Sequence, residues 1–92
     1  MSEVSRIVLI ANRRGLHARA SAKFVTLASQ QPCEVRVEKD GSGDGVTGTS
    51  IMGLMMLGAA MGDHIRISAS GDGAAEVVDA MVALVEAKFG ED

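Results

Sequence analysis

The stretch of chain that most constrains the fold is residues 7–29, which read IVLIANRRGLHARASAKFVTLAS. Its β-branched start predicts a strand over residues 4–10. Residues 12–15 are polar, end in glycine and terminate this strand. The composition that follows favours a helix over Ala18–Ser29. The expected apolar face of this helix consists of Ala18, Ala22, Val25 and Ala28, with Phe24 on its flank. A strand is therefore expected to pass through a short turn directly into a helix.

Five further elements are expected after this helix, separated by glycine-rich turns such as residues 40–45. The pattern predicts strands over residues 35–38, 45–47 and 65–68, a short helix over residues 51–57 and a long helix over residues 74–89. The order β-α-β-β-α-β-α predicts one α+β domain, residues 1–92, built as an open-faced sandwich. Its four-stranded, mainly antiparallel sheet would carry three helices on one face. A right-handed crossover would make the first two strands parallel, with the fourth antiparallel between them.

The charge and the single cysteine narrow the classes of function. A net charge of −3 and a pI near 5.3 argue against a general nucleic-acid-binding protein, although Arg13, Arg14 and Arg19 make one region locally positive. Cys33 alone cannot form an intrachain disulfide, and no signal peptide is recognisable, so we expect a cytoplasmic protein. No apolar run is long enough for a membrane span. We interpret Cys33 as a small residue near the start of a strand rather than as a nucleophile.

His17 is the strongest candidate for chemistry because it lies where the turn enters the first helix. The first N–H groups of a helix lack intrahelical partners and favour an anion. A neutral imidazole at this position can attack a phosphoryl donor, with Arg19 within plausible reach of the product. The alternative is that His17 merely caps the helix. The only other histidine is His64, and no cluster of Cys, His and carboxylates has ligand spacing, so we expect neither a metal nor a cofactor.

The short apolar helix over residues 51–57 has more apolar side chains than one face can bury. Thr49 or Ser50 is expected to be its N-cap. The positions divide into two core candidates, Leu54 and Leu57, and three surface candidates, Ile51, Met52 and Met55. An exposed, methionine-containing surface is typical of a docking face, because methionine adapts to several partners. The alternative is that the three surface candidates are core residues or would serve only as crystal contacts.

Two segments resemble a known protein family. Residues 12–25, NRRGLHARASAKFV, closely resemble the active-site segment of HPr, the histidine phosphocarrier of the bacterial phosphotransferase system. Residues 49–58, TSIMGLMMLG, resemble the regulatory-serine helix of the same family, and the resemblance covers essentially the whole chain. It implies that enzyme I, using phosphoenolpyruvate, phosphorylates His17 on Nδ1. It also implies that Arg19 is the supporting cation and that Ser50 is a regulatory phosphorylation site.

The same resemblance implies the partners. Enzyme I and IIA-type acceptor proteins would dock on the surface candidates Ile51, Met52 and Met55, and an HPr kinase/phosphorylase would act on Ser50. The chain would be a monomeric phosphoryl carrier rather than a stand-alone enzyme, with no nucleic-acid or membrane partner. Two features depart from the family pattern: Ala20 stands where a Pro usually follows the active-site Arg, and the turn over residues 40–45 is longer than the usual hairpin.

Two functional hypotheses of different classes remain at this point. The first is a phosphoryl carrier, serving either sugar uptake or a regulatory, nitrogen-linked cascade. Ala20 and the run GLMML at residues 53–57 look more like the nitrogen-linked branch. The second is a small α/β regulatory or ligand-binding module without phosphotransfer, which gives His17 no special role.

Overall fold

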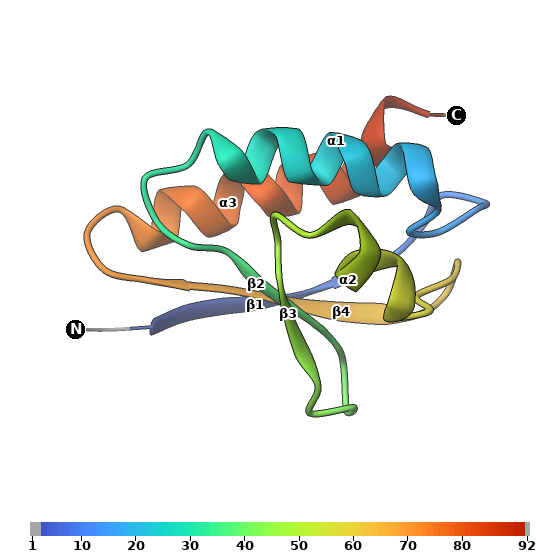
Figure 1. The fold of residues 1–92 in the computed structure, drawn as a ribbon, viewed down its shortest axis with the longest axis horizontal. Coiled ribbons are helices and arrows are strands. Elements are labelled where there is room, and N and C mark those ends of the chain that lie inside the picture. The colour runs from blue at the N-terminus through green and yellow to red at the C-terminus, as the bar shows by residue number, and fades with distance from the viewer. Residues whose placement is uncertain (1–2, 92) are drawn as a thin grey trace.

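The computed structural model describes residues 3–91. The elements follow the order β1 (Glu3–Leu9), α1 (Ala18–Ser29), β2 (Arg36–Lys39), β3 (Gly45–Thr47), α2 (Ile51–Met56), β4 (His64–Ser70), α3 (Ala74–Glu86) and the 3₁₀ turn η1 (Lys88–Gly90). Figure 1 shows α1 and α3 on one side of the sheet, whereas the other side is open. The predicted open-faced α+β sandwich is confirmed.

The four strands form one sheet in the order β1-β4-β2-β3, and all neighbouring strands are antiparallel. Because β4 is antiparallel to both β1 and β2, these two strands run in the same direction on either side of it, as the crossover rule predicts. Val8 pairs with Ile65, and Val37 pairs with Ile67. These four side chains are buried, so the register directs one apolar face of the sheet towards the helices.

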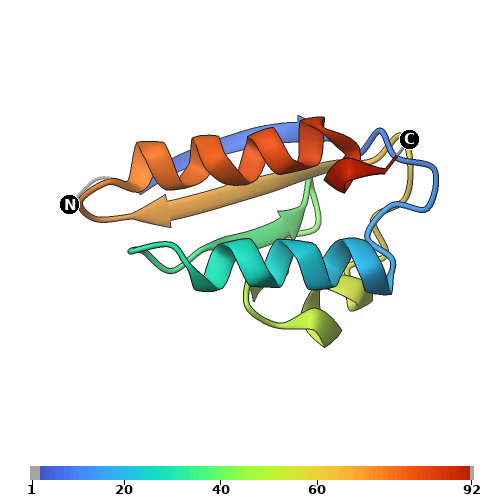
Figure 2. The same ribbon diagram turned by 90° about the horizontal axis from the view of Figure 1, so that it is seen from above.

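The helices complete the core from their buried faces. Figure 2 shows α3 lying over β1 and β4, with α1 beside it. The short helix α2 packs against α1 and β3. The largest fully buried side chains come from all of these layers and include Phe24, Ile10, Leu54, Ile67, Met81 and Phe89. Phe24 and Phe89 are the two aromatic side chains in a core that is otherwise built from aliphatic residues and methionine.

The buried face of α1 differs from the expected one. Ala18 is exposed, whereas Ala20, Phe24 and Ala28 are buried. These three residues are four positions apart, so they form one stripe along the helix. Phe24 has the largest apolar surface in the helix, and its burial determines which stripe faces the core. The expectation that Phe24 lies on the flank of the apolar face was therefore wrong.

The last helix is shorter than expected. It ends at Glu86, and both Lys88 and Phe89 have a left-handed φ of 57°. This turn folds the chain back so that the Phe89 ring is buried, and the Lys23 ammonium donates a hydrogen bond to the Phe89 carbonyl at 2.7 Å. Burial of the ring and this bond help to offset the cost of two left-handed non-glycine residues, about 1–2 kcal/mol each. The turn also places Glu91 next to α1.

Candidate functional site

The turn before α1 determines where His17 lies. Gly15 has a φ of +61°, and a Cβ at this position would lie 2.3 Å from the Ala59 carbonyl oxygen, so only glycine fits. The next residue, Leu16, is buried and donates its N–H to the same Ala59 carbonyl at 3.0 Å. His17 follows as the N-cap of α1 with an extended backbone. The turn is therefore fixed to the rest of the fold immediately before the candidate nucleophile.

The imidazole of His17 has a different partner at each nitrogen. Its Nδ1 accepts a hydrogen bond from the Arg19 N–H at 3.3 Å, and its Nε2 lies 2.9 Å from Oε2 of Glu91. Both side chains are only 17% exposed. An ionised carboxylate can only accept hydrogen bonds, whereas Nδ1 receives a donor. In the neutral ring, this pattern places the proton on Nε2 and the lone pair on Nδ1.

Glu91 is held in place from two directions. The hydrogen bond from Lys23 to the Phe89 carbonyl fixes the chain just before it. The side-chain amide of Asn12 donates to Oε1 of Glu91 at 3.3 Å and to the Gly15 carbonyl at 2.9 Å. Asn12 is fully buried, and its Oδ1 is the one buried side-chain polar atom within residues 3–91 that lacks a hydrogen-bond partner. Asn12 therefore links the turn before α1 to the carboxylate at the end of the chain.

Three residues of the site were not expected from the sequence; they are Asn12, Lys23 and Glu91. Glu91 and His17 are 74 positions apart, and no local pattern signals that they meet. The identity of Asn12 could have suggested a turn, because Asn commonly bonds to nearby backbone. Its contact with Glu91 depends on the left-handed turn at the end of α3.

A basic hollow adjoins the site at Arg19 and Glu91, the two residues that contact the His17 ring. Four cationic side chains line it together with Gly90 and Glu91; they are Arg13, Arg14, Arg19 and Lys23. The hollow has a volume of about 450 Å³. The positive region expected from the sequence therefore extends to Lys23, one turn along α1 from Arg19. A concave surface with several cations concentrates anions, and guanidinium groups bind phosphate oxygens in pairs.

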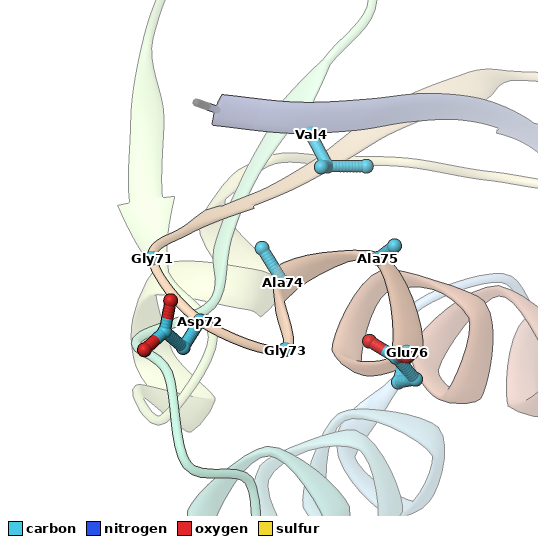
Figure 3. Close-up of a pocket in the computed structure, with 7 residues that line it drawn as sticks. All are labelled: Val4, Gly71, Asp72, Gly73, Ala74, Ala75 and Glu76. Atoms are coloured by element: carbon cyan, nitrogen blue, oxygen red, sulfur yellow. The ribbon is translucent and has the colours of Figure 1, made fainter. Parts of the chain in front are cut away.

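A second hollow of about 340 Å³ lies at the start of α3, and Figure 1 shows that this end of α3 and the start of α1 are at opposite ends of the molecule. Val4 and residues 71–76 line it, and their ionisable side chains are the carboxylates Asp72 and Glu76 (Figure 3). Its charge is thus opposite to that of the hollow beside His17. The Cys33 thiol, which lies nearby, donates to the Asp72 carbonyl at 3.1 Å.

Ser50 is the N-cap of α2. Its Oγ accepts a hydrogen bond from the Gly53 N–H at 2.9 Å, which confirms one of the two expected caps. Leu54 is fully buried and the three expected surface residues, Ile51, Met52 and Met55, are exposed, so these four assignments are confirmed. Leu57, the second core candidate, is only half-buried, because it is the C-cap of α2 and packs against the edge of the core. Met56 and Met61, at 80% and 58% exposure, enlarge the apolar surface beyond these three residues. A docking role for this surface stays a prediction.

Two other expectations concern absent features. Within residues 3–91, no three Cys, His, Asp or Glu side chains are grouped so that they could hold a metal ion. None of the helices described in the structure is long and apolar enough to span a bilayer.

The family follows from a comparison with known proteins. The family model for the PTS HPr component phosphorylation site matches residues 4–87. The chain belongs to the HPr family. It is therefore a phosphocarrier rather than a stand-alone catalyst, and its partners belong to the phosphotransferase system.

Relatives named HPr and NPr both match nearly the whole chain. The phosphocarrier protein HPr of Neisseria meningitidis is 50% identical over 82 residues, which cover 89% of this chain and 90% of the relative. The phosphocarrier protein NPr of Shewanella violacea is 40% identical over 94 residues, covering 99% of this chain and 98% of the relative. The match therefore supports the carrier role common to HPr and NPr, and the expected preference for the nitrogen-linked branch stays a prediction.

Solved HPr structures have the same fold. HPr-C-His from Thermoanaerobacter tengcongensis superposes with a TM-score of 0.85 at 44% identity, covering 100% of this chain and 99% of that chain. An HPr dimer from the same organism has a TM-score of 0.72 at 45% identity, covering 99% of this chain and 100% of that chain. Because a related HPr forms a dimer, the expected monomeric state of this chain stays a prediction.

Proposed function

We propose that this HPr-family chain accepts a phosphoryl group on Nδ1 of His17 from phosphorylated enzyme I and passes it to a IIA-type acceptor protein. The observation that carries the proposal is the orientation of the His17 ring at the start of α1. Its Nε2 faces a carboxylate at 2.9 Å, which leaves the lone pair on Nδ1, and a basic hollow lies alongside. We place this exchange in the cytoplasm, where the single cysteine would remain reduced.

The chemical step is an in-line displacement at phosphorus. The Nδ1 lone pair of His17 forms a bond to phosphorus while the bond from phosphorus to the donor breaks, and that electron pair leaves with the donor atom. The Arg19 N–H, which donates to Nδ1 at 3.3 Å in the unphosphorylated protein, would become available to a phosphoryl oxygen. The Arg19 guanidinium would bind further phosphoryl oxygens, since it lines the same hollow. Transfer to the acceptor is the reverse displacement.

The apolar surface on α2 is proposed as the docking face for both donor and acceptor. Ile51, Met52 and Met55 are exposed on a helix that packs against α1, and His17 is the N-cap of α1. A protein that must bind a donor and then an acceptor with one surface benefits from methionine, because its unbranched side chain adapts to different shapes.

Ser50 is proposed as a regulatory site for an HPr kinase/phosphorylase. Its hydroxyl begins the helix that carries the docking face, and it is partly exposed. A phosphate there would add a charge of about −1.5 to −2 at the rim of an apolar surface. Docking would then require desolvation of that charge, so the phosphate would weaken the interaction with enzyme I.

Labelling by enzyme I tests the proposal. The protein is incubated with purified enzyme I and phosphoenolpyruvate, and its mass is measured at neutral and at acidic pH. We expect one added phosphoryl group that is lost in acid, and peptide mapping should place it on His17. The competing hypothesis of a ligand-binding module without phosphotransfer predicts no added mass. Absence of labelling by an enzyme I preparation that labels the N. meningitidis relative would contradict the proposal.

A further inference from the structure

We infer that Glu91 is a positioning residue for phosphoryl transfer: it holds His17 in the tautomer and ring orientation that present the Nδ1 lone pair to the donor, and Asn12 orients Glu91 in turn. The inference rests on the proposed function of His17. The contact that carries it is the 2.9 Å distance between Nε2 of His17 and Oε2 of Glu91, in a site where both side chains are largely buried.

The tautomer follows from the donors and acceptors around the ring. Glu91 accepts at Nε2, and the Arg19 N–H donates at Nδ1. The opposite tautomer would turn an N–H of the ring towards the Arg19 N–H and a lone pair towards the carboxylate. Each of these contacts is repulsive, and because each side chain is only 17% exposed, water can relieve little of the repulsion. The site therefore accommodates one neutral tautomer of His17 and excludes the other.

Glu91 also acts during the reaction. As Nδ1 bonds to phosphorus, the ring acquires positive charge while Nε2 keeps its proton. The carboxylate of Glu91 lies beside that proton and offsets the developing charge. The same arrangement of a carboxylate behind a functional histidine orients the ring in metal sites and in hydrolases.

The placement of Glu91 argues against a purely blocking role. Its carboxylate faces Nε2, and Nδ1 is on the other side of the imidazole, where Arg19 lies. Asn12 holds the second carboxylate oxygen at 3.3 Å and the Gly15 carbonyl at 2.9 Å. The carboxylate is thus anchored to the turn that positions His17, which is the arrangement expected of a support and not of a group that must leave before reaction.

The first experiment measures the tautomer directly in unphosphorylated protein. Nitrogen-15 NMR of the ring distinguishes a protonated Nε2 from a protonated Nδ1 without any partner protein. We expect the wild-type ring, when neutral, to be protonated on Nε2 and its Nε2–H to exchange slowly with water. Glu91→Gln, which keeps the shape but removes the charge, should lower the Nε2–H population and accelerate that exchange, and Glu91→Asp should restore part of the effect. Glu86→Gln, which removes the same charge at an exposed position of α3, is the matched control and should leave the ring unchanged.

The second experiment measures transfer from enzyme I to the same variants. Glu91→Gln should lower kcat for phosphorylation of His17 by about tenfold, the scale observed when a carboxylate that orients a functional histidine is lost. KM should stay near the wild-type value, because Glu91 is not one of the proposed docking residues on α2. Circular dichroism should show the same fold for every variant, and Glu86→Gln should transfer at the wild-type rate.

The outcomes separate this inference from the proposed function. If wild-type protein accepts no phosphoryl group, the proposed function fails. If wild type is labelled but Glu91→Gln has an unchanged ring tautomer and an unchanged kcat, only the positioning role fails. Faster transfer in Glu91→Gln would likewise overturn it, since the carboxylate would then be an obstacle.

Discussion

His17 and Ser50 are both N-cap residues, yet they are surrounded by different chemistry. The Nδ1 of His17 accepts a long bond of 3.3 Å, and its second nitrogen contacts Glu91 beside four cationic side chains. The Oγ of Ser50 accepts a shorter bond of 2.9 Å and begins a helix whose exposed residues are apolar. The same local device, a side chain that closes the first turn of a helix, thus occurs in an anion-attracting site and at the edge of an apolar surface.

The difference indicates why one cap can be a phosphoryl carrier and the other a modification site. Imidazole has two nitrogens, so His17 can hold the ring in place with one and react with the other. A serine has a single oxygen, and that of Ser50 already accepts from the Gly53 N–H. Among the hydrogen bonds of residues 3–91, no carboxylate contacts the Ser50 hydroxyl in the way that Glu91 contacts the His17 ring. A separate kinase would have to supply the base that activates the hydroxyl.

The largest expected effect comes from exchanging each cap for alanine. His17→Ala should abolish phosphorylation by enzyme I, whereas Ser50→Ala should transfer at a near-normal rate. Each variant loses a helix cap, which costs about 1 kcal/mol in the free energy of unfolding. Labelling with enzyme I and urea denaturation check the two parts. Continued labelling of His17→Ala would show that a residue other than His17 accepts the phosphoryl group.

Phosphorylation of Ser50 should have the next largest effect. An anion at a helix N-terminus is electrostatically favourable, so the melting temperature should be nearly unchanged. Docking should suffer, with KM for enzyme I rising about tenfold or more, equivalent to at least ~1.4 kcal/mol of binding. The measurement compares rates of His17 phosphorylation in modified and unmodified protein. Ser50→Asp should reproduce part of the loss because it adds less charge, and equal rates in all three samples would reduce Ser50 to a structural cap.

Substitutions of Arg19 test whether the positive charge beside His17 assists phosphoryl transfer. Arg19→Ala should slow transfer about tenfold, less than the ~10²–10³-fold that follows loss of a buried oxyanion donor, because Arg19 is exposed. Arg19→Lys should be intermediate, since an ammonium cannot make the paired bonds of a guanidinium. Single-turnover transfer rates from enzyme I provide the measurement. Identical rates for Arg, Lys and Ala would exclude a role in binding the phosphoryl group.

Substitutions on α2 test whether its exposed apolar surface is a docking face. Met52→Asp should raise KM for enzyme I several-fold and leave the melting temperature nearly unchanged, because Met52 is 69% exposed. Leu54→Ala on the same helix is the contrasting variant: Leu54 is fully buried, and its loss should cost about 2–5 kcal/mol of stability. Thermal melts and transfer kinetics separate the two effects. A strongly destabilised Met52→Asp would mean that this residue supports the fold instead of a partner.

Ala20→Pro should give the smallest effect. Ala20 lies in the first turn of α1, where proline is tolerated because the first N–H groups need no intrahelical partner. The substitution should stabilise the protein by about 0.4–1 kcal/mol through the unfolded chain. Urea denaturation checks it. Ala20 is fully buried, so a loss of stability would show that the proline ring crowds its neighbours in the core.

The sequence by itself determined the order of the elements and the position of both caps. The strand pattern at Val35 and Val37, the helical pattern in residues 74–85 and the glycine turns are local signals, and local periodicity is sufficient to specify which segments become strands and helices. His17 and Ser50 could be located for the same reason, because a cap is defined by its position next to a helix. The exposure of Met52 could be predicted because one face of a short helix cannot bury all of its apolar side chains.

Only the tertiary structure decided what surrounds His17. The contact with Glu91 joins residues 74 positions apart, and it forms because Phe89 is buried through a left-handed turn that ends α3 early. The buried stripe of α1 likewise depends on which face of the helix packs in the core, and this is the face that carries Phe24. The contact with Glu91 has no local pattern, and the i, i+4 spacing in α1 fits more than one stripe, so packing against segments that are distant in the chain selects both features. The proposed nucleophile could therefore be located from the sequence, whereas the residues that contact its ring could be found only in the folded protein.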